Sequence, residues 1–113
     1  MTDIEIVAQL EATLEAFPRG YADLEAIKAF DALLKDLELI TEAPTSLITE
    51  KTNSIRGWVS VLYIQRKRQK HCGAETVGLY IRQDLVSLRT IILSSRKQAA
   101  LLVSEELSYY ARQ

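Results

Sequence analysis

Residues 76–92 read Thr-Val-Gly-Leu-Tyr-Ile-Arg-Gln-Asp-Leu-Val-Ser-Leu-Arg-Thr-Ile-Ile, and the choice between strand and helix in this stretch decides the fold of the chain. Apolar and polar residues alternate over 76–82 and again over 86–92, which is the period of a half-buried strand. A tight turn at Gln83-Asp84 would join these two strands. Residues 58–64, rich in β-branched and aromatic types, supply a third. The pattern predicts an antiparallel β-meander over about 57–93.

The same stretch also fits a helix, in which Arg82, Arg89 and Arg96 line one flank at heptad spacing. Its apolar residues then recur with a period of about 3.6 residues: Val77, Ile81, Leu85, Leu88 and Ile92. A helix from Val77 to the last residue would exceed 30 residues, against a mean of about 11 to 12. In addition, Ser95 forms a capping box with the glutamine three residues on, which favours a new helix start there. We therefore predict an α+β fold, with an all-α four-helix bundle as the alternative.

The N-terminal half predicts an antiparallel helical hairpin. Thr2 and Glu5 form a capping box that starts the first helix, and Pro18 and Gly20 stop it. A second helix follows over about 21–40, and the short connection makes the two helices antiparallel. Six apolar residues are expected to share the core face of this hairpin: Leu10, Leu14, Ile27, Phe30, Leu34 and Leu37.

The other predicted elements are a loop over 41–45, a short helix over 46–53 and a C-terminal helix that begins near Ser95. The last of these carries apolar residues at helical spacing, which predicts a buried face. That face consists of Ala99, Leu102, Val103, Leu107 and Tyr110.

Length and composition predict a single globular domain over 1–113. Of its residues, 48% are hydrophobic and 26% charged, which is an ordinary globular balance. No apolar run has the length of a membrane span, and the acidic N-terminus is unlike a secretory signal, so we expect a cytoplasmic protein without membrane contact. A lone cysteine forms no disulfide within the chain.

Charge is distributed unequally between the two halves of the chain. Residues 1–50 hold 11 acids and 3 bases, whereas residues 51–113 hold 11 bases and 4 acids. One interpretation is that acidic helices pack beside the basic segment and pair with it. The other is that the basic half binds a polyanion or an acidic partner.

No motif indicates catalysis, a cofactor or a metal, so we predict that the protein is not an enzyme. The acids lie on the polar faces of the first two helices, and no Gly-rich phosphate loop or metal-ligand spacing occurs. His71 and Cys72 are adjacent, but a nucleophilic pair normally draws its two residues from separate parts of the fold.

The run Arg-Lys-Arg-Gln-Lys-His over 66–71 is the strongest single motif, because clustered basic side chains attract phosphates. With other arginines of the second half, it predicts a polyanion-binding set of Arg56, Arg66, Lys67, Arg68, Lys70, Arg82 and Arg89. A solvated hairpin loop is the competing interpretation.

Leu79, Val86 and Leu93 form an apolar stripe outside the expected core if their segment is helical. Surplus apolar surface on a small domain indicates a partner interface or self-association. We therefore predict a non-enzymatic macromolecular binding module, such as a small regulator, inhibitor, adaptor or assembly subunit that docks to a partner protein. The alternative is a nucleic-acid-binding subunit that contacts the phosphate backbone through the basic second half.

Overall fold

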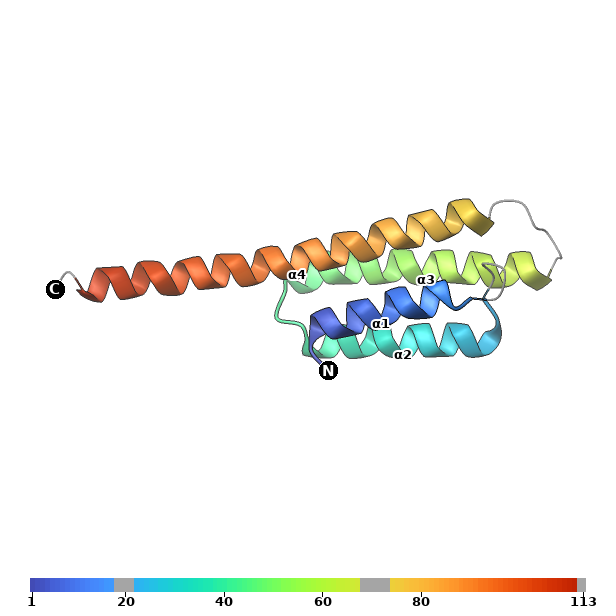
Figure 1. The fold of residues 1–113 in the computed structure, drawn as a ribbon, viewed down its shortest axis with the longest axis horizontal. Helices are drawn as coiled ribbons and strands as arrows, with labels where there is room; N and C mark the ends of the chain where they lie inside the picture. Colours follow the sequence, from blue (N-terminus) through green and yellow to red (C-terminus); the bar gives the residue numbers. More distant parts are fainter. Residues whose placement is uncertain (18–21, 68–73, 112–113) are drawn as a thin grey trace.

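The computed structural model describes residues 1–17, 22–67 and 74–111, with side chains over 1–17, 22–64 and 75–101. These residues form four helices: α1 (Asp3–Glu15), α2 (Leu24–Ile40), α3 (Thr45–Lys67) and α4 (Ala74–Ala111). The helices lie side by side as a bundle, with α4 running far beyond the others (Figure 1). The longest extent is 69 Å, whereas the other two are 22 and 21 Å.

The first helix begins at the cap predicted from the sequence, Thr2, and the second begins at Asp23, for which no cap was predicted. The Glu5 amide donates to Thr2 Oγ1 at 3.2 Å, and the Thr2 hydroxyl donates to Glu5 Oε1 at 3.1 Å. The Glu5 carboxylate therefore accepts a hydrogen bond from the side-chain hydroxyl of the capping residue. Asp23 caps α2 by accepting from the Ala26 amide at 2.7 Å. The predicted helix start at Tyr21 and the predicted stop at Pro18 and Gly20 lie outside the described residues.

The predicted α+β fold is wrong, and the all-α alternative is right. Residues 58–64 belong to α3, and residues 76–82 and 86–92 belong to α4, so the described part of the chain contains no strand. The Gln83-Asp84 turn and the helix start at Ser95 are wrong as well, because both positions lie inside α4. The predicted short helix over 46–53 is the first part of α3.

The pattern of buried residues along α4 follows the period of a helix and not that of a strand. A strand would place Val86 and Leu88 on the same face, yet Val86 is 60% exposed and Leu88 is fully buried. Among the described side chains of α4, the buried ones are those of the helical pattern: Val77, Ile81, Leu85, Leu88 and Ile92. Among those of α3, the buried ones are Ile48, Thr52, Ile55, Val59 and Leu62. Packing between two such faces outweighs the strand preference of single residues.

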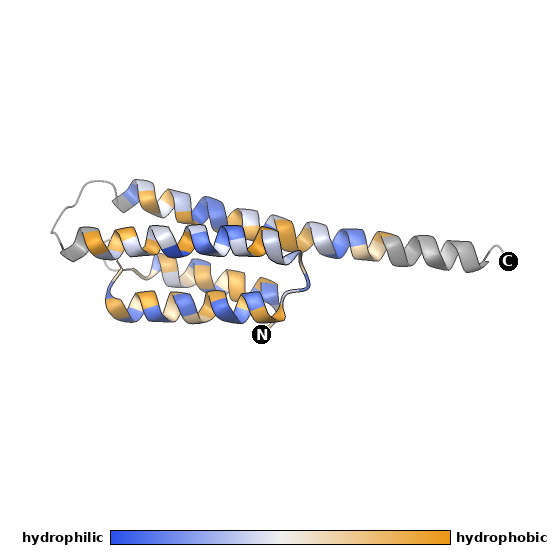
Figure 2. Ribbon diagram, turned by 180° about the vertical axis from the view of Figure 1, so that it is seen from behind, coloured by the Kyte–Doolittle hydropathy of each residue, from blue (hydrophilic) through white to orange (hydrophobic). Residues whose placement is uncertain are grey.

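One residue of the predicted turn, Asp84, takes part in the same helix–helix contact. Asp84 accepts a hydrogen bond from the Ser54 hydroxyl at 2.7 Å, which joins α3 to α4. The aromatic rings of Trp58 and Tyr80 also meet across the two helices, with centroids 4.9 Å apart. Every helix in Figure 2 has both apolar and polar residues, as expected for a bundle in which each helix covers one face of its neighbours.

The predicted core of the N-terminal hairpin is confirmed except at Ile27, which is only partly buried. The other five residues are at most 7% exposed: Leu10, Leu14, Phe30, Leu34 and Leu37. By contrast, Ala99 is exposed, so it is not part of a buried face. Leu102, Val103, Leu107 and Tyr110 lie outside the described side chains.

Candidate functional site

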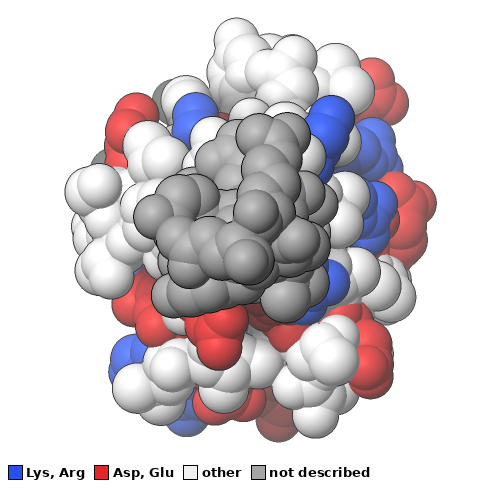
Figure 3. All heavy atoms as spheres, turned by 90° about the vertical axis from the view of Figure 1, so that its left-hand side faces the viewer, with Lys and Arg blue, Asp and Glu red and all other residues white. Residues whose placement is uncertain are grey.

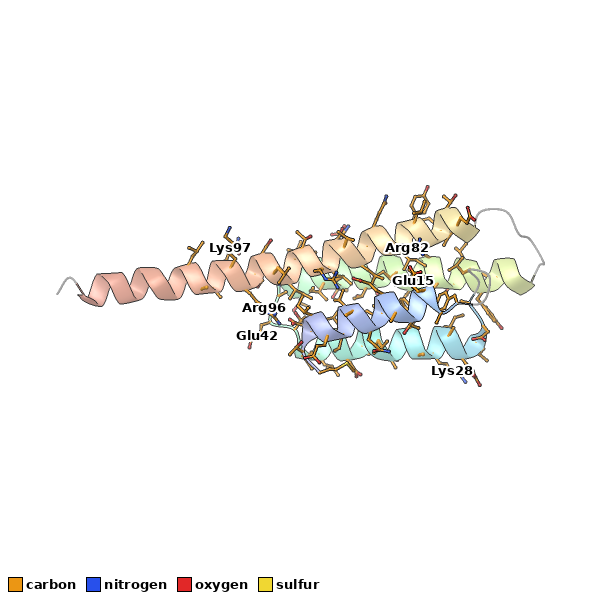
Figure 4. All side chains as sticks on the ribbon, viewed as in Figure 1. Glu15, Lys28, Glu42, Arg82, Arg96 and Lys97 are labelled. Carbon is orange, nitrogen blue, oxygen red and sulfur yellow. The ribbon has the colours of Figure 1, made fainter. Side chains whose placement is uncertain are left out.

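Ion pairs between the acidic and the basic half of the chain form the first candidate region. The acids of α1 and the arginines of α4 face each other along two antiparallel helices, as the positions of Glu15 and Arg82 illustrate (Figure 4). Three pairs join these helices: Arg82–Glu15 at 2.8 Å, Arg89–Glu11 at 2.8 Å, and Arg96–Asp3. The three arginines recur every seven residues, so they lie along one flank of α4, and this flank contacts α1.

Asp3 is the buried member of this series. Its carboxylate caps the Ile4 amide at 2.8 Å and accepts from the Thr41 hydroxyl at 3.2 Å, besides pairing with Arg96. Asp3 therefore ties the start of α1 to the end of α2 and to the point where α4 leaves the bundle.

Arg56 of α3 binds two acids of α2. Its Nε lies 2.9 Å from Asp31 Oδ1, and its Nη2 lies 2.6 Å from Glu38 Oε1. The hydrogen bond from Arg56, followed by that from Lys35, lowers the pKa of the Asp31 carboxyl. Burial opposes the charge of Arg56, but the hydrogen bonds to Asp31 and Glu38 outweigh it and raise the pKa of the guanidinium. This cluster ties α2 to α3 electrostatically.

The Asp31 cluster predicts a pH dependence of stability. Because the pKa of Asp31 is lower in the folded state, its stabilising effect is fully present above the unfolded value of about 3.9. The effect is lost as the pH falls through the folded value. Asp31→Asn should therefore be less stable than the unchanged protein at pH 7, by less than about 1 kcal/mol for this partly exposed group. Urea unfolding at acidic pH should show that difference shrinking.

Asp36 is exposed on the same helix and provides the control for that measurement. Asp36→Asn should leave the free energy of unfolding at pH 7 nearly unchanged. The lowered pKa of Asp31 would be contradicted if the difference in free energy of unfolding between Asp31→Asn and the unchanged protein grew as the pH fell.

The arginines of the predicted polyanion-binding set lie in different environments. Arg56, Arg82 and Arg89 are the partners of α1 and α2 acids described above. Arg66 and Lys67 belong to the end of α3 and their side chains are not described, while Arg68 and Lys70 lie outside the described residues, as do His71 and Cys72. The observed ion pairs agree with the interpretation in which the two halves neutralise each other. Around the projecting end of α4, acids and bases are interspersed among other residues on the visible surface (Figure 3).

The exposed apolar face of α4 is the second candidate region. Leu79 is 53% exposed, Val86 60% and Leu93 48%, and the three occur every seven residues. Sequence reasoning missed that the series continues past the bundle, where Ala100 is exposed and Leu101 is 55% exposed. The continued seven-residue spacing was the signal that could have revealed it. We call Leu79, Val86, Leu93 and Ala100 the α4 stripe.

An open notch of 550 Å³ lies where α4 leaves the bundle. Its lining combines the Asp3–Arg96 pair with apolar side chains from the bundle end, including Met1 and Ile40. Both of these apolar residues are largely exposed, at 72% and 45%. In this part of the structure the carboxylate and guanidinium bind each other, which suits a structural role rather than acid–base chemistry.

Within the described ranges, no three His, Cys, Asp or Glu side chains gather as metal ligands. None of the helices there combines the length and apolar character that crossing a membrane requires. No family model matches the chain, and neither a similar curated protein nor a similar solved structure was found.

Proposed function

We propose that this protein is a non-enzymatic docking module that binds a partner protein through the outer face of α4. The observation that carries the proposal is the exposed α4 stripe. The inner face of the same helix already packs against α1 and α3, so the stripe adds nothing to the core. It extends over residues 79–100, about 31 Å of helix. An apolar row of that length on a small domain is a typical docking surface for another helix or a groove.

Charge supports the same proposal. Arg82 and Arg89, on the flank of the stripe, are held by α1 carboxylates and are less available to a polyanion. Arg56 is held in the same way by α2. A partner would therefore meet an apolar row beside neutralised charges, which favours a protein surface over a phosphate backbone.

The test is affinity purification from native lysate with the unchanged chain and with Val86→Glu, each with and without nuclease. We expect a protein that the unchanged chain retains after nuclease treatment and that Val86→Glu loses at least tenfold, since a charge would be buried in the contact. Val86 is exposed, so circular dichroism should show that the variant keeps its fold.

Leu39→Glu is the matched control, because Leu39 is 83% exposed on α2 and lies away from α4. It should retain the partner as well as the unchanged chain does. Equal recovery by Val86→Glu would refute docking through the stripe. Recovery that nuclease abolishes would instead favour the nucleic-acid alternative.

A further inference from the structure

The exposed sides of α1 and α4 form one continuous surface. A hollow of about 400 Å³ lies between the two helices, and its lining includes Ala8 and Ala12 of α1 and Val86 of the α4 stripe. All three side chains are exposed, so no described part of the chain covers them. We call the α4 stripe together with these two alanines the α1–α4 face.

We infer that the α1–α4 face pairs with the same face of a second copy of the chain, about a two-fold axis parallel to the helices. This pairing rests on the proposed function, because the second copy is then the partner that covers the α4 stripe. Within one copy α1 and α4 run antiparallel, as the Arg82–Glu15 and Arg96–Asp3 pairs require. The axis therefore places α4 of each copy on α1 of the other, with equal heights along the two bundles facing each other.

The apolar residues of α4 then lie against the alanines of α1. The Arg82–Glu15 pair sets the heights of these residues along the bundle. Val86 comes one turn after Arg82, and Ala12 comes about one turn before Glu15, so Val86 and Ala12 are at the same height. Val86 of each copy therefore packs on Ala12 of the other. A large side chain opposite a small one lets two helix faces interlock without a void.

A second contact of the same kind follows one ion pair further along. Leu93 comes one turn after Arg89, and Ala8 comes about one turn before Glu11, which binds Arg89. Leu93 is 48% exposed and Ala8 is exposed as well, so both are free to meet a second copy. The two-fold axis repeats each of these contacts, which gives four in all.

The charges at the centre of the face are complementary across the same axis. Arg82 and Glu15 are 50% and 66% exposed, so each has room for a second partner. With α4 on α1 of the second copy, Arg82 of one copy lies opposite Glu15 of the other, and four charges alternate in sign around the axis. Packing α4 on α4 antiparallel, about the middle of the stripe, would instead bring Lys97 to the height of Arg82 of the second copy. Like charges at that contact repel.

Glu5 and Lys97 are charges at the edge of the face that the bundle does not pair. Both side chains are exposed, and neither makes an ion pair among the described side chains. Lys97 points away from the other three helices (Figure 4). It follows Arg96, which binds the start of α1, so Lys97 and Glu5 are at similar heights. The axis places Lys97 of each copy beside Glu5 of the other, so both charges gain a partner.

The size of the face sets the expected affinity. The 13 residues of α1 extend over about 20 Å. The face is two helices wide, with helix axes roughly 9 Å apart. Such a contact is at the lower end of specific interfaces, which bury about 800 Å² per partner, so we expect a dimer Kd in the micromolar range.

Sedimentation equilibrium of the full chain at low salt tests this pairing. The unchanged chain should form dimers, and Ala12→Glu should raise the dimer Kd at least tenfold, because it places a charge against Val86 of the second copy. Ala32→Glu is the matched control, because Ala32 is exposed on α2 outside the face, and it should leave the Kd unchanged. Circular dichroism of each variant separates loss of pairing from loss of fold.

A charge exchange tests the orientation of the two copies. Lys97→Glu and Glu5→Lys should each raise the dimer Kd several-fold, because two symmetry-related attractions become repulsions. The double variant Lys97→Glu/Glu5→Lys restores opposite charges and should return the Kd toward that of the unchanged chain. Lys28→Glu is the control for the change at Lys97, because Lys28 is exposed on α2 far from α4, and it should change nothing (Figure 4).

A chain that stays monomeric at millimolar concentration would overturn the pairing. So would an Ala12→Glu variant that dimerises as tightly as the unchanged chain, or a double variant weaker than either single one. The proposed function fails separately. A monomeric chain whose Val86→Glu variant loses a partner from lysate refutes self-pairing and leaves docking through the α4 stripe intact. A dimer that Val86→Glu does not weaken, together with unchanged recovery from lysate, refutes both.

Discussion

Replacing Leu34 with alanine should lower the free energy of unfolding by about 2 to 5 kcal/mol, as expected when a buried leucine leaves a cavity. Leu34 is 1% exposed at the centre of the hairpin core, with Phe30 and Leu37 one turn away on either side. Urea unfolding followed by circular dichroism would measure the loss. The cost should fall in the upper part of the range if the neighbouring rings and leucines cannot close the gap.

Lys35→Ala is the control for Leu34, because it changes the neighbouring residue of α2, whose side chain is exposed. The Lys35 side chain is 67% exposed and pairs with Asp31 at 3.0 Å, so its loss should cost less than about 1 kcal/mol. Comparable losses of free energy of unfolding for the two variants would show that the buried face of α2 is wrongly assigned.

Leu88→Ala and Val86→Ala should differ sharply, and this pair tests the helical state of the stretch that decides the fold. Leu88 is fully buried against the other helices, so its truncation should cost about 2 to 5 kcal/mol. Val86 is 60% exposed, and alanine is the better helix former, so that variant should be within about 0.5 kcal/mol of the unchanged protein.

Val86 and Leu88 are two positions apart, and this spacing distinguishes a strand from a helix. A strand would place both side chains on one face, and both truncations would then have similar costs. Equal losses in urea unfolding would therefore contradict the packing of α4 described here. If only Leu88→Ala loses free energy of unfolding, the fold does not depend on the Val86 side chain. Val86 can then be changed in the partner-binding experiment without unfolding the protein.

The candidate site was only partly visible in the sequence. The seven-residue series of Arg82, Arg89 and Arg96 and that of Leu79 and Val86 can both be read from the chain once it is taken as a helix. The ion-pair partners of the arginines cannot, because Asp3, Glu11 and Glu15 are more than 60 residues away in sequence and meet them only after α1 docks on α4.

The sequence by itself determined the N-terminal hairpin. Thr2 and Asp23 supply cap oxygens within three residues of the amides they bind, and the apolar residues of α1 and α2 fit the helical period alone. Those signals are local, so they act before any distant segment is in place.

Only the tertiary structure decided whether residues 58–64 and 76–92 form strands or helices. Both stretches combine strand-forming residue types with spacings that fit two periods, and local preferences of well under 1 kcal/mol per residue do not separate them. Burial of Ile55, Leu62, Ile81, Leu85 and their neighbours between α3 and α4 is a far larger effect, at about 1.5 to 3 kcal/mol for each large side chain. That contact forms only when both segments are helical. Only the helical period places the buried side chains of α3 on one face of α3 and those of α4 on one face of α4.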